Sequence, residues 1–195
     1  MNSHDASNAD GSVAAKAAYL VFFDSTDLHL CPDVGNSYVP IGNQQKVESP
    51  GKENPWRAVF GSLIYPTGEG IYTIHERKRH LEVKAHLEQL IGSDPNGFYF
   101  VIIDNASAHT TPMLDDFWRA HSQILEPVFL PTYSPHLNLI ERLWGFMRGQ
   151  MTQNHFYEKI ESLCQAVVGW LEKLPFSQFC SLMGIDESTL ELAHS

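Results

Sequence analysis

The chain has 195 residues, of which 43% are hydrophobic and 18% are charged, so it buries a globular core of about one domain and is not a disordered protein. Its formal net charge of −10 excludes a protein whose overall charge attracts DNA, so any grip on DNA must come from metal ions, a partner or a further segment. Three cysteines without a CxxC spacing predict a reduced, cytoplasmic chain, and no apolar run is long enough to predict a membrane span.

Two continuous apolar runs define the predicted sheet. Residues 1–17 are small and polar and are expected to form a disordered N-terminal tail ahead of one domain over residues 18–195. The apolar run that follows predicts a buried strand ending at Asp24, and residues 27–31 are expected to continue this strand or to pair with it. A second run, residues 98–103, predicts a strand that is buried on both faces and stops at Asp104.

The other elements follow from periodicity and turn residues. A turn rich in Pro and Gly joins two of the strands into a hairpin. Further strands are expected over residues 44–47, 56–65, 70–75 and 125–130, and helices over residues 78–91, 111–121, 139–151, 157–174 and 176–183. Strands first, then helices and strands in alternation, predict an α/β fold, a mixed sheet flanked by helices.

Three acids lie at the positions where active sites are expected in an α/β fold. Asp24 and Asp104 each end an apolar strand, and Glu141 lies in the first turn of a helix. Converging carboxylates repel one another unless divalent cations neutralise them, and oxygen ligands favour Mg²⁺, for which Mn²⁺ can substitute. Two such ions about 3.5–4 Å apart hold the attacking and leaving oxygens of a phosphoryl transfer. The pattern therefore predicts the cutting and joining of phosphodiesters.

Glu141 also has a purely structural interpretation. Asn138 followed three residues later by Glu141 is the pattern of a capping box, in which Asn138 is the helix cap. An acid in the first turn also suits the positive end of the helix dipole. The two other acids favour the catalytic interpretation of Glu141.

Several polar side chains accompany the acids, and each has two interpretations. Asn105 either orients a phosphate or water or is ordinary turn material, and His109 either contacts the cleft or caps the next helix. Arg142 and Arg148 are candidates for phosphate contacts or solvated charges on the helix surface. Trp144 either stacks on a base or, because it lies on the apolar stripe, packs in the core.

Three segments carry a resemblance to a known family. They are FFDSTDLHLCP (22–32), VIIDNASAH (101–109) and LPTYSPHLNLIERLW (130–144). Together they resemble the catalytic domain of mariner-superfamily DDE transposases, in particular the bacterial insertion-sequence branch. The resemblance extends over residues 19–174, and residues 39–63 match the stretch that this family carries between its first two acids.

The resemblance implies an RNase H-like fold with two Mg²⁺ ions bound by Asp24, Asp104 and Glu141. It also implies cleavage and strand transfer with transposon-end and target DNA as partners, by a homodimer or by pairing with a DNA-binding half. Two departures stand out. Family members commonly have an acid where this chain has Ser25, and the helix-turn-helix region that they carry before this domain is not found in residues 1–17.

We therefore expect a metal-dependent DNA strand-transfer domain in a bacterial cytoplasm, associated with the nucleoid when it acts. The alternative is a catalytically silent, truncated transposase fragment that regulates or pairs with a full-length enzyme, or a relic. The acidic net charge favours the alternative for the isolated chain, and the three acids favour the enzyme. A glycosidase is a weaker interpretation, because it needs only two carboxylates.

Overall fold

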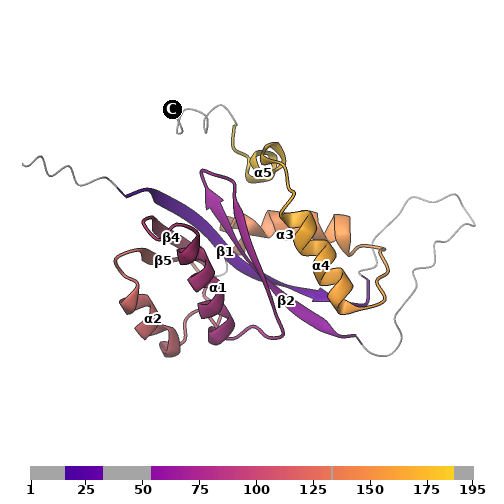
Figure 1. The fold of residues 1–195 in the computed structure, drawn as a ribbon, viewed down its shortest axis with the longest axis horizontal. Coiled ribbons are helices and arrows are strands. Elements are labelled where there is room, and N and C mark those ends of the chain that lie inside the picture. The colour runs from indigo at the N-terminus through magenta and orange to yellow at the C-terminus, as the bar shows by residue number, and fades with distance from the viewer. Residues whose placement is uncertain (1–15, 33–53, 133, 187–195) are drawn as a thin grey trace, which may run out of the picture.

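A computed structural model describes residues 16–32, 54–132 and 134–186 of the chain (Figure 1). This part contains a five-stranded sheet, five α-helices and two short 3₁₀-helices. The strands are β1 (Ala18–His29), β2 (Trp56–Tyr65), β3 (Gly70–His75), β4 (Phe98–Ile103) and β5 (Leu125–Phe129). The helices are α1 (His80–Ser93), η1 (Pro112–Leu114), α2 (Asp115–Ala120), η2 (Pro135–Leu137), α3 (Ile140–Met151), α4 (Ile160–Leu171) and α5 (Phe176–Met183).

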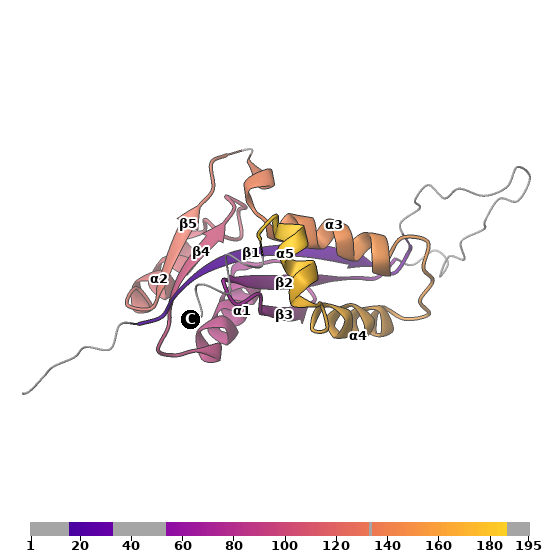
Figure 2. The same cartoon turned by 90° about the horizontal axis from the view of Figure 1, so that it is seen from above.

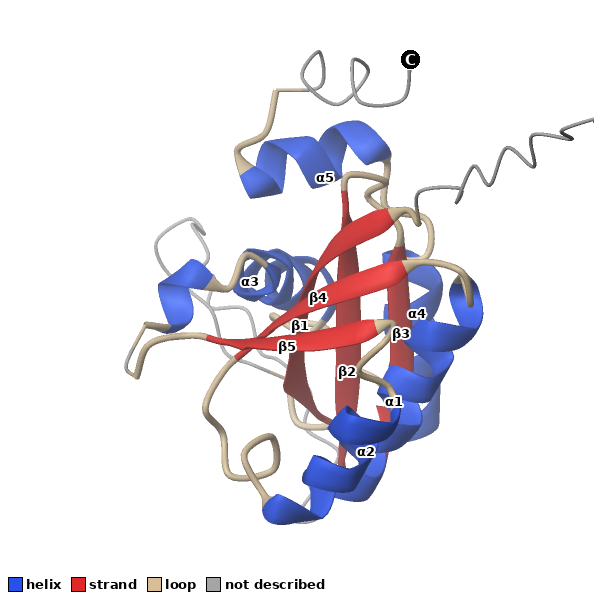
Figure 3. Cartoon of the chain, turned by 90° about the vertical axis from the view of Figure 1, so that its left-hand side faces the viewer, coloured by secondary structure: helices blue, strands red, loops and turns tan. Residues whose placement is uncertain are grey.

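The sheet is mixed, with the strand order β3-β2-β1-β4-β5 (Figure 3). The first three strands form an antiparallel meander, and β1, β4 and β5 run parallel to one another. Parallel neighbours need crossover connections, which here contain α1 between β1 and β4 and α2 between β4 and β5. The predicted mixed α/β sheet flanked by helices is confirmed.

Two buried clusters of apolar side chains lie on opposite faces of the sheet. One cluster joins β1 and β2 to α3, α4 and α5, and the other joins β1, β2 and β4 to α1 and the segment of η1 and α2. Alternate residues of β1 supply both clusters: Phe22 faces α3, whereas Val21 and Phe23 face α1. Figure 2 shows α3 running alongside β1.

Most predicted elements are present at nearly the predicted positions. The bounds of β2, β3 and α5 are those predicted, whereas α1 begins and ends two residues later than predicted and α4 is shorter at both ends. The expected helix over 111–121 is divided into η1 and α2. The expected strand at 44–47 and most of the expected tail at 1–17 lie outside the described residues. No helix in the described ranges is long and apolar enough to cross a membrane.

The first predicted strand does not stop at Asp24 but continues into the following segment, which is one of the two expectations for residues 27–31. β1 continues to His29, because residues 20–29 pair along their whole length with β2. The pairing of β1 with β4, in contrast, stops at Phe22 opposite Ile102. Asp24 therefore lies within a strand, just beyond the point where β1 and β4 separate.

A buried histidine links α1 to the hairpin of β2 and β3. The side chain of His86 is fully buried, with Nε2 2.9 Å from Ser62 Oγ and Nδ1 2.7 Å from Thr73 Oγ1. Each hydroxyl can donate or accept, so neutral His86 is satisfied in either tautomer. Burial, with a smaller contribution from the neighbouring His75, lowers the pKa of His86 from 6.5 to about 3.

We expect the stability of the fold to depend on this histidine in acid. Below about pH 6.5 the unfolded chain binds a proton at His86, whereas the folded chain does not bind one until about pH 3. The free energy of unfolding should therefore decrease by a few kcal/mol as the pH is lowered from about 6.5 to about 3. Urea unfolding at several pH values should show a weaker pH dependence in His86→Gln than in wild type. The exposed His155→Gln is the control, and equal pH dependence in His86→Gln and wild type would contradict the assignment.

Candidate active site

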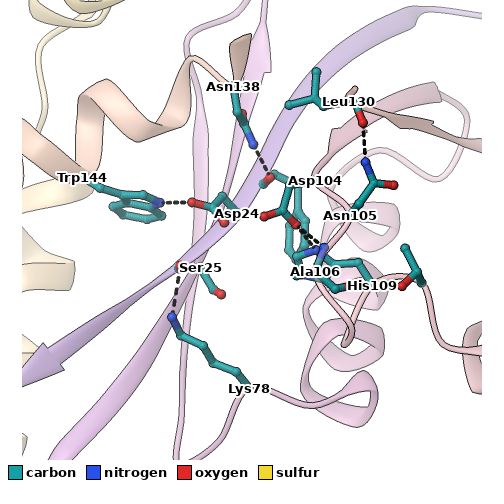
Figure 4. Close-up of polar contacts among 12 residues, drawn as sticks. Asp24, Ser25, Lys78, Asp104, Asn105, Ala106, His109, Leu130, Asn138 and Trp144 are labelled. Atoms are coloured by element: carbon teal, nitrogen blue, oxygen red, sulfur yellow. Dashed lines mark hydrogen bonds and ion pairs between the residues drawn. The ribbon is translucent and has the colours of Figure 1, made fainter. Parts of the chain in front are cut away.

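The two aspartates lie on the walls of one pocket at the point where β1 and β4 separate (Figure 4). Asp104 directly follows β4, and Asp24 lies two residues beyond the last β1 residue paired with β4. The pocket has a volume of about 280 Å³ and is also lined by Lys78 and His109. The structure therefore brings these two predicted acids to one pocket.

Asp24 is the more buried of the two aspartates, with 9% of its surface exposed. The indole Nε1 of Trp144 donates a hydrogen bond to its Oδ2 over 3.1 Å. The pKa of Asp24 is raised to about 7, mainly by burial. The backbone N–H of Ser25 opposes this rise, and the negative charges of Glu141 and Asp104 contribute to it. Asp24 thus carries a charge that its protein surroundings only partly stabilise.

Asp104 has the opposite electrostatic environment. His109 Nδ1 lies 2.6 Å from Asp104 Oδ1, and the backbone N–H of Ala106 donates to the same oxygen over 3.0 Å. The hydrogen bond with His109 lowers the pKa of Asp104, although partial burial opposes this effect. The His109 side chain is only 4% exposed and its ring packs against Phe23. This geometry makes His109 a partner of Asp104 and leaves little of its surface for a phosphate.

Glu141 lies in the first turn of α3, next to these aspartates but not among the residues that line the pocket. Its charge is close enough to Asp24 to raise the pKa of that carboxyl. Within the described ranges, no three His, Cys, Asp or Glu side chains are grouped closely enough to hold a metal ion. The structure therefore brings two acids together and the third near them.

The prediction that Asn138 caps the helix is wrong. The cap position of α3 is Leu139, and no side chain caps the helix there. The Asn138 amide instead donates to the backbone carbonyl of Phe23 over 2.8 Å, in a buried position. Its Oδ1 has no hydrogen-bond partner among the described residues. Asn138 therefore connects the start of α3 to β1, beside Asp24.

The other predicted site residues make contacts with the protein. Arg148 Nη1 donates to Thr26 Oγ1 over 2.8 Å, two residues beyond Asp24 on β1. Arg142 Nη1 donates over 3.1 Å to the carbonyl of Leu182, near the end of α5, and so lies away from the pocket. The Asn105 amide donates to the carbonyl of Leu130, which joins the segments that follow β4 and β5.

Two further residues make polar contacts at the site. Lys78 Nζ lies 2.9 Å from Asp27 Oδ1 and 3.2 Å from the carbonyl of Ser25, which places a positive charge at the pocket. Trp144 belongs to the core, as the apolar stripe predicts, but its N–H reaches Asp24. The sequence signal for this contact is the spacing of Trp144 from Glu141. Residues three apart lie on the same side of a helix, so a site at Glu141 places Trp144 near it.

Residues 19–164 match the model of a protein family described as DDE superfamily endonuclease. The chain belongs to this family. A protein of insertion element IS630 from Shigella sonnei, described as an uncharacterized 39 kDa protein, is 26% identical over 163 residues, which are 82% of this chain and 47% of that protein. The DDE endonuclease chain thus spans about half the length of this curated relative.

Solved structures of a transposase share the fold. One is the Mos1 transposase paired-end complex with the left transposon end. The match covers 88% of this DDE endonuclease chain and 53% of the Mos1 chain, with a TM-score of 0.65 and 16% sequence identity. The Mos1 mariner paired-end complex with Mn gives the same four values. The predicted RNase H-like fold is confirmed, as is the resemblance to the mariner and insertion-sequence group.

The Asn138 contact with β1 should contribute to stability. We expect Asn138→Ala to lower the free energy of unfolding by about 1–3 kcal/mol, because the buried carbonyl of Phe23 loses its donor. Urea denaturation checks this value. Asn96→Ala, in an exposed turn, should change stability by less than about 0.5 kcal/mol. Equal stability of the two variants would contradict a role for the Asn138 amide.

The His109 contact should hold the pKa of Asp104 low. We expect His109→Phe to raise the pKa of Asp104, because burial then acts without the hydrogen bond that opposes it. The titration of the Asp104 carboxyl carbon, followed by ¹³C NMR, measures the change. His121→Phe, whose histidine packs on α2 and bonds to Phe117, is the matched control and should leave the titration unchanged. An unaltered titration in His109→Phe would show that another group sets the pKa.

Proposed function

We propose that this chain is the catalytic domain of a transposase that cleaves and rejoins DNA strands with the help of divalent metal ions. The observation that carries the proposal is the meeting of Asp24 and Asp104 in one pocket, with Glu141 beside them, inside a domain of the DDE endonuclease family. We assign these three acids as the catalytic and metal-binding residues.

The donor set at the pocket fits a hard divalent ion. Carboxylate oxygens are the ligands that Mg²⁺ and Mn²⁺ prefer. The raised pKa of Asp24 indicates a buried carboxylate that lacks sufficient positive charge from the protein, and a divalent cation would supply it. The Mos1 structures that share this fold include complexes with Mn and with Mg, which supports the same choice of ions.

Hydrogen bonds hold both aspartates at the pocket. Trp144 donates to Oδ2 of Asp24, whereas His109 and Ala106 hold Oδ1 of Asp104. Carboxylates held in this way would bind the ions. When bound, two ions would activate the attacking oxygen and stabilise the leaving oxygen of a phosphodiester. Lys78 would add a positive charge for the DNA backbone at the same pocket.

The substrate that this site fits is DNA. Relatives and fold neighbours support this assignment: one relative belongs to an insertion element, and the Mos1 complex contains a transposon end. Because the chain has a net charge of −10, we propose that it acts with a second subunit or a DNA-binding half that supplies positive charge. We assign its place of action to the bacterial cytoplasm, at the nucleoid.

Nicking of supercoiled plasmid DNA by the full chain tests the proposal. We expect conversion to open circles in millimolar Mg²⁺ or Mn²⁺ but not in EDTA, and at least a 100-fold slower rate in Asp104→Asn, because a lost ligand removes the metal chemistry. Asp116→Asn, on the exposed surface of α2, is the control and should nick like wild type. Equal nicking by Asp104→Asn, or none by wild type even after a DNA-binding half is added, would reject the catalytic function and favour a silent fragment.

A further inference from the structure

We propose that Trp144 is a positioning residue of the active site, whose indole N–H holds the Asp24 carboxylate in the orientation that binds the divalent ion. This inference rests on the proposed function. Its basis is the hydrogen bond from Nε1 to Oδ2 of Asp24 over 3.1 Å, which joins α3 to the middle of β1 (Figure 4).

The indole is held rigidly by its surroundings. Trp144 is 1% exposed and belongs to the cluster between the sheet and α3 to α5. Tyr72 of β3 meets its ring edge-on, with ring centroids 6.4 Å apart. A buried side chain with so little freedom presents its single donor in one direction only. Burial also excludes the alternative that Trp144 stacks on a DNA base.

Gly61 makes the contact between Trp144 and Asp24 sterically feasible. It lies on β2 directly opposite Asp24 in the antiparallel pairing. A Cβ atom at position 61 would lie 2.6 Å from Cη2 and 2.8 Å from Cζ2 of Trp144, well inside van der Waals contact. The absence of a side chain at this position therefore leaves the space into which the indole ring reaches.

The direction of the hydrogen bond distinguishes positioning from simple core packing. A buried indole N–H needs an acceptor, and it bonds here to the carboxylate that the metal site requires. Trp144 also lies one turn after Glu141 on the same helix. One rigid ring thus fixes the distance between β1, with Asp24, and the helix that carries the third acid. Partners of this kind orient metal ligands, and their loss typically weakens metal binding about 10–100-fold.

Binding of Mn²⁺ to the full chain tests the inference directly. Electron paramagnetic resonance of free Mn²⁺ gives the dissociation constant without any DNA or reaction. We expect Trp144→Phe, which keeps a ring but loses the N–H, to raise this constant about 10–100-fold. Trp170→Phe is the matched control, because Trp170 packs at the edge of the same cluster, against Phe146. It should bind Mn²⁺ like wild type.

The Mn²⁺ dependence of nicking provides a second measurement, which distinguishes a loss of metal binding from a loss of core packing. In Trp144→Phe the Mn²⁺ concentration for half-maximal nicking should rise with the dissociation constant, whereas the rate at saturating Mn²⁺ should fall much less. If Trp144→Phe does not fold, 3-benzothienylalanine at position 144 provides the test, because it keeps the bicyclic shape and replaces only the N–H by sulfur.

The outcomes separate the inference from the proposed function. If wild type binds Mn²⁺, Asp104→Asn does not, and the position-144 variants bind like wild type, the positioning role is overturned and the catalytic function remains. If wild type itself binds no Mn²⁺ at millimolar concentration, both fail. Weakened binding in the position-144 variants alone, with Trp170→Phe unchanged, supports the inference.

Discussion

The arrangement of the site depends on three polar contacts that join β1 to α3 and to Asn138, which lies two residues before the helix begins. In chain order, Asn138 bonds to the carbonyl of Phe23, Trp144 to the carboxylate of Asp24 and Arg148 to the hydroxyl of Thr26. Because the partners on β1 follow the same order, α3 runs in the direction of β1. Directional hydrogen bonds at these three positions, together with the close packing of the buried face, fix the register of the helix on the sheet. The register of α3 in turn sets where Glu141 lies.

The same contacts explain the unequal properties of the two aspartates. Asp24 faces the buried side of this helix, so desolvation dominates and its pKa rises. Asp104 lies beyond the end of β4, where the chain turns through Ala106 to His109 and returns two donors to the carboxylate. Asp104 therefore ionises more readily than Asp24, although both lie in one pocket. A bound cation would stabilise the ionised form of Asp24 most.

The sequence predicted the sheet well because its signals are local. Apolar runs and the Pro-Gly turn gave the bounds of β2 and β3, and helical periodicity gave α5. Both aspartates were located for the same reason. The sequence left open whether residues 27–31 continue the first strand or pair with it, because the course of β1 beyond Asp24 depends on pairing with β2 across a long intervening segment.

The sequence did not predict hydrogen bonds between side chains and partners that are far apart along the chain. The pattern of Asn138 and Glu141 indicates a cap, but the amide bonds to a carbonyl 115 residues away. The apolar stripe correctly predicted that Trp144 is buried and gave no indication that its N–H meets a carboxylate 120 residues distant. Periodicity reports which face of a helix is buried, and it carries no information about which polar group that face meets.

The close approach of Gly61 to Trp144 has an evolutionary consequence. The space above position 61 is filled by an indole that starts from a different layer, so neither residue can change freely while the other stays. Homologous domains with a smaller side chain in place of the tryptophan should tolerate alanine or serine in place of the glycine. Those that keep the tryptophan should keep the glycine. Positions 61 and 144 should therefore covary, although 82 residues lie between them (144 − 61 − 1).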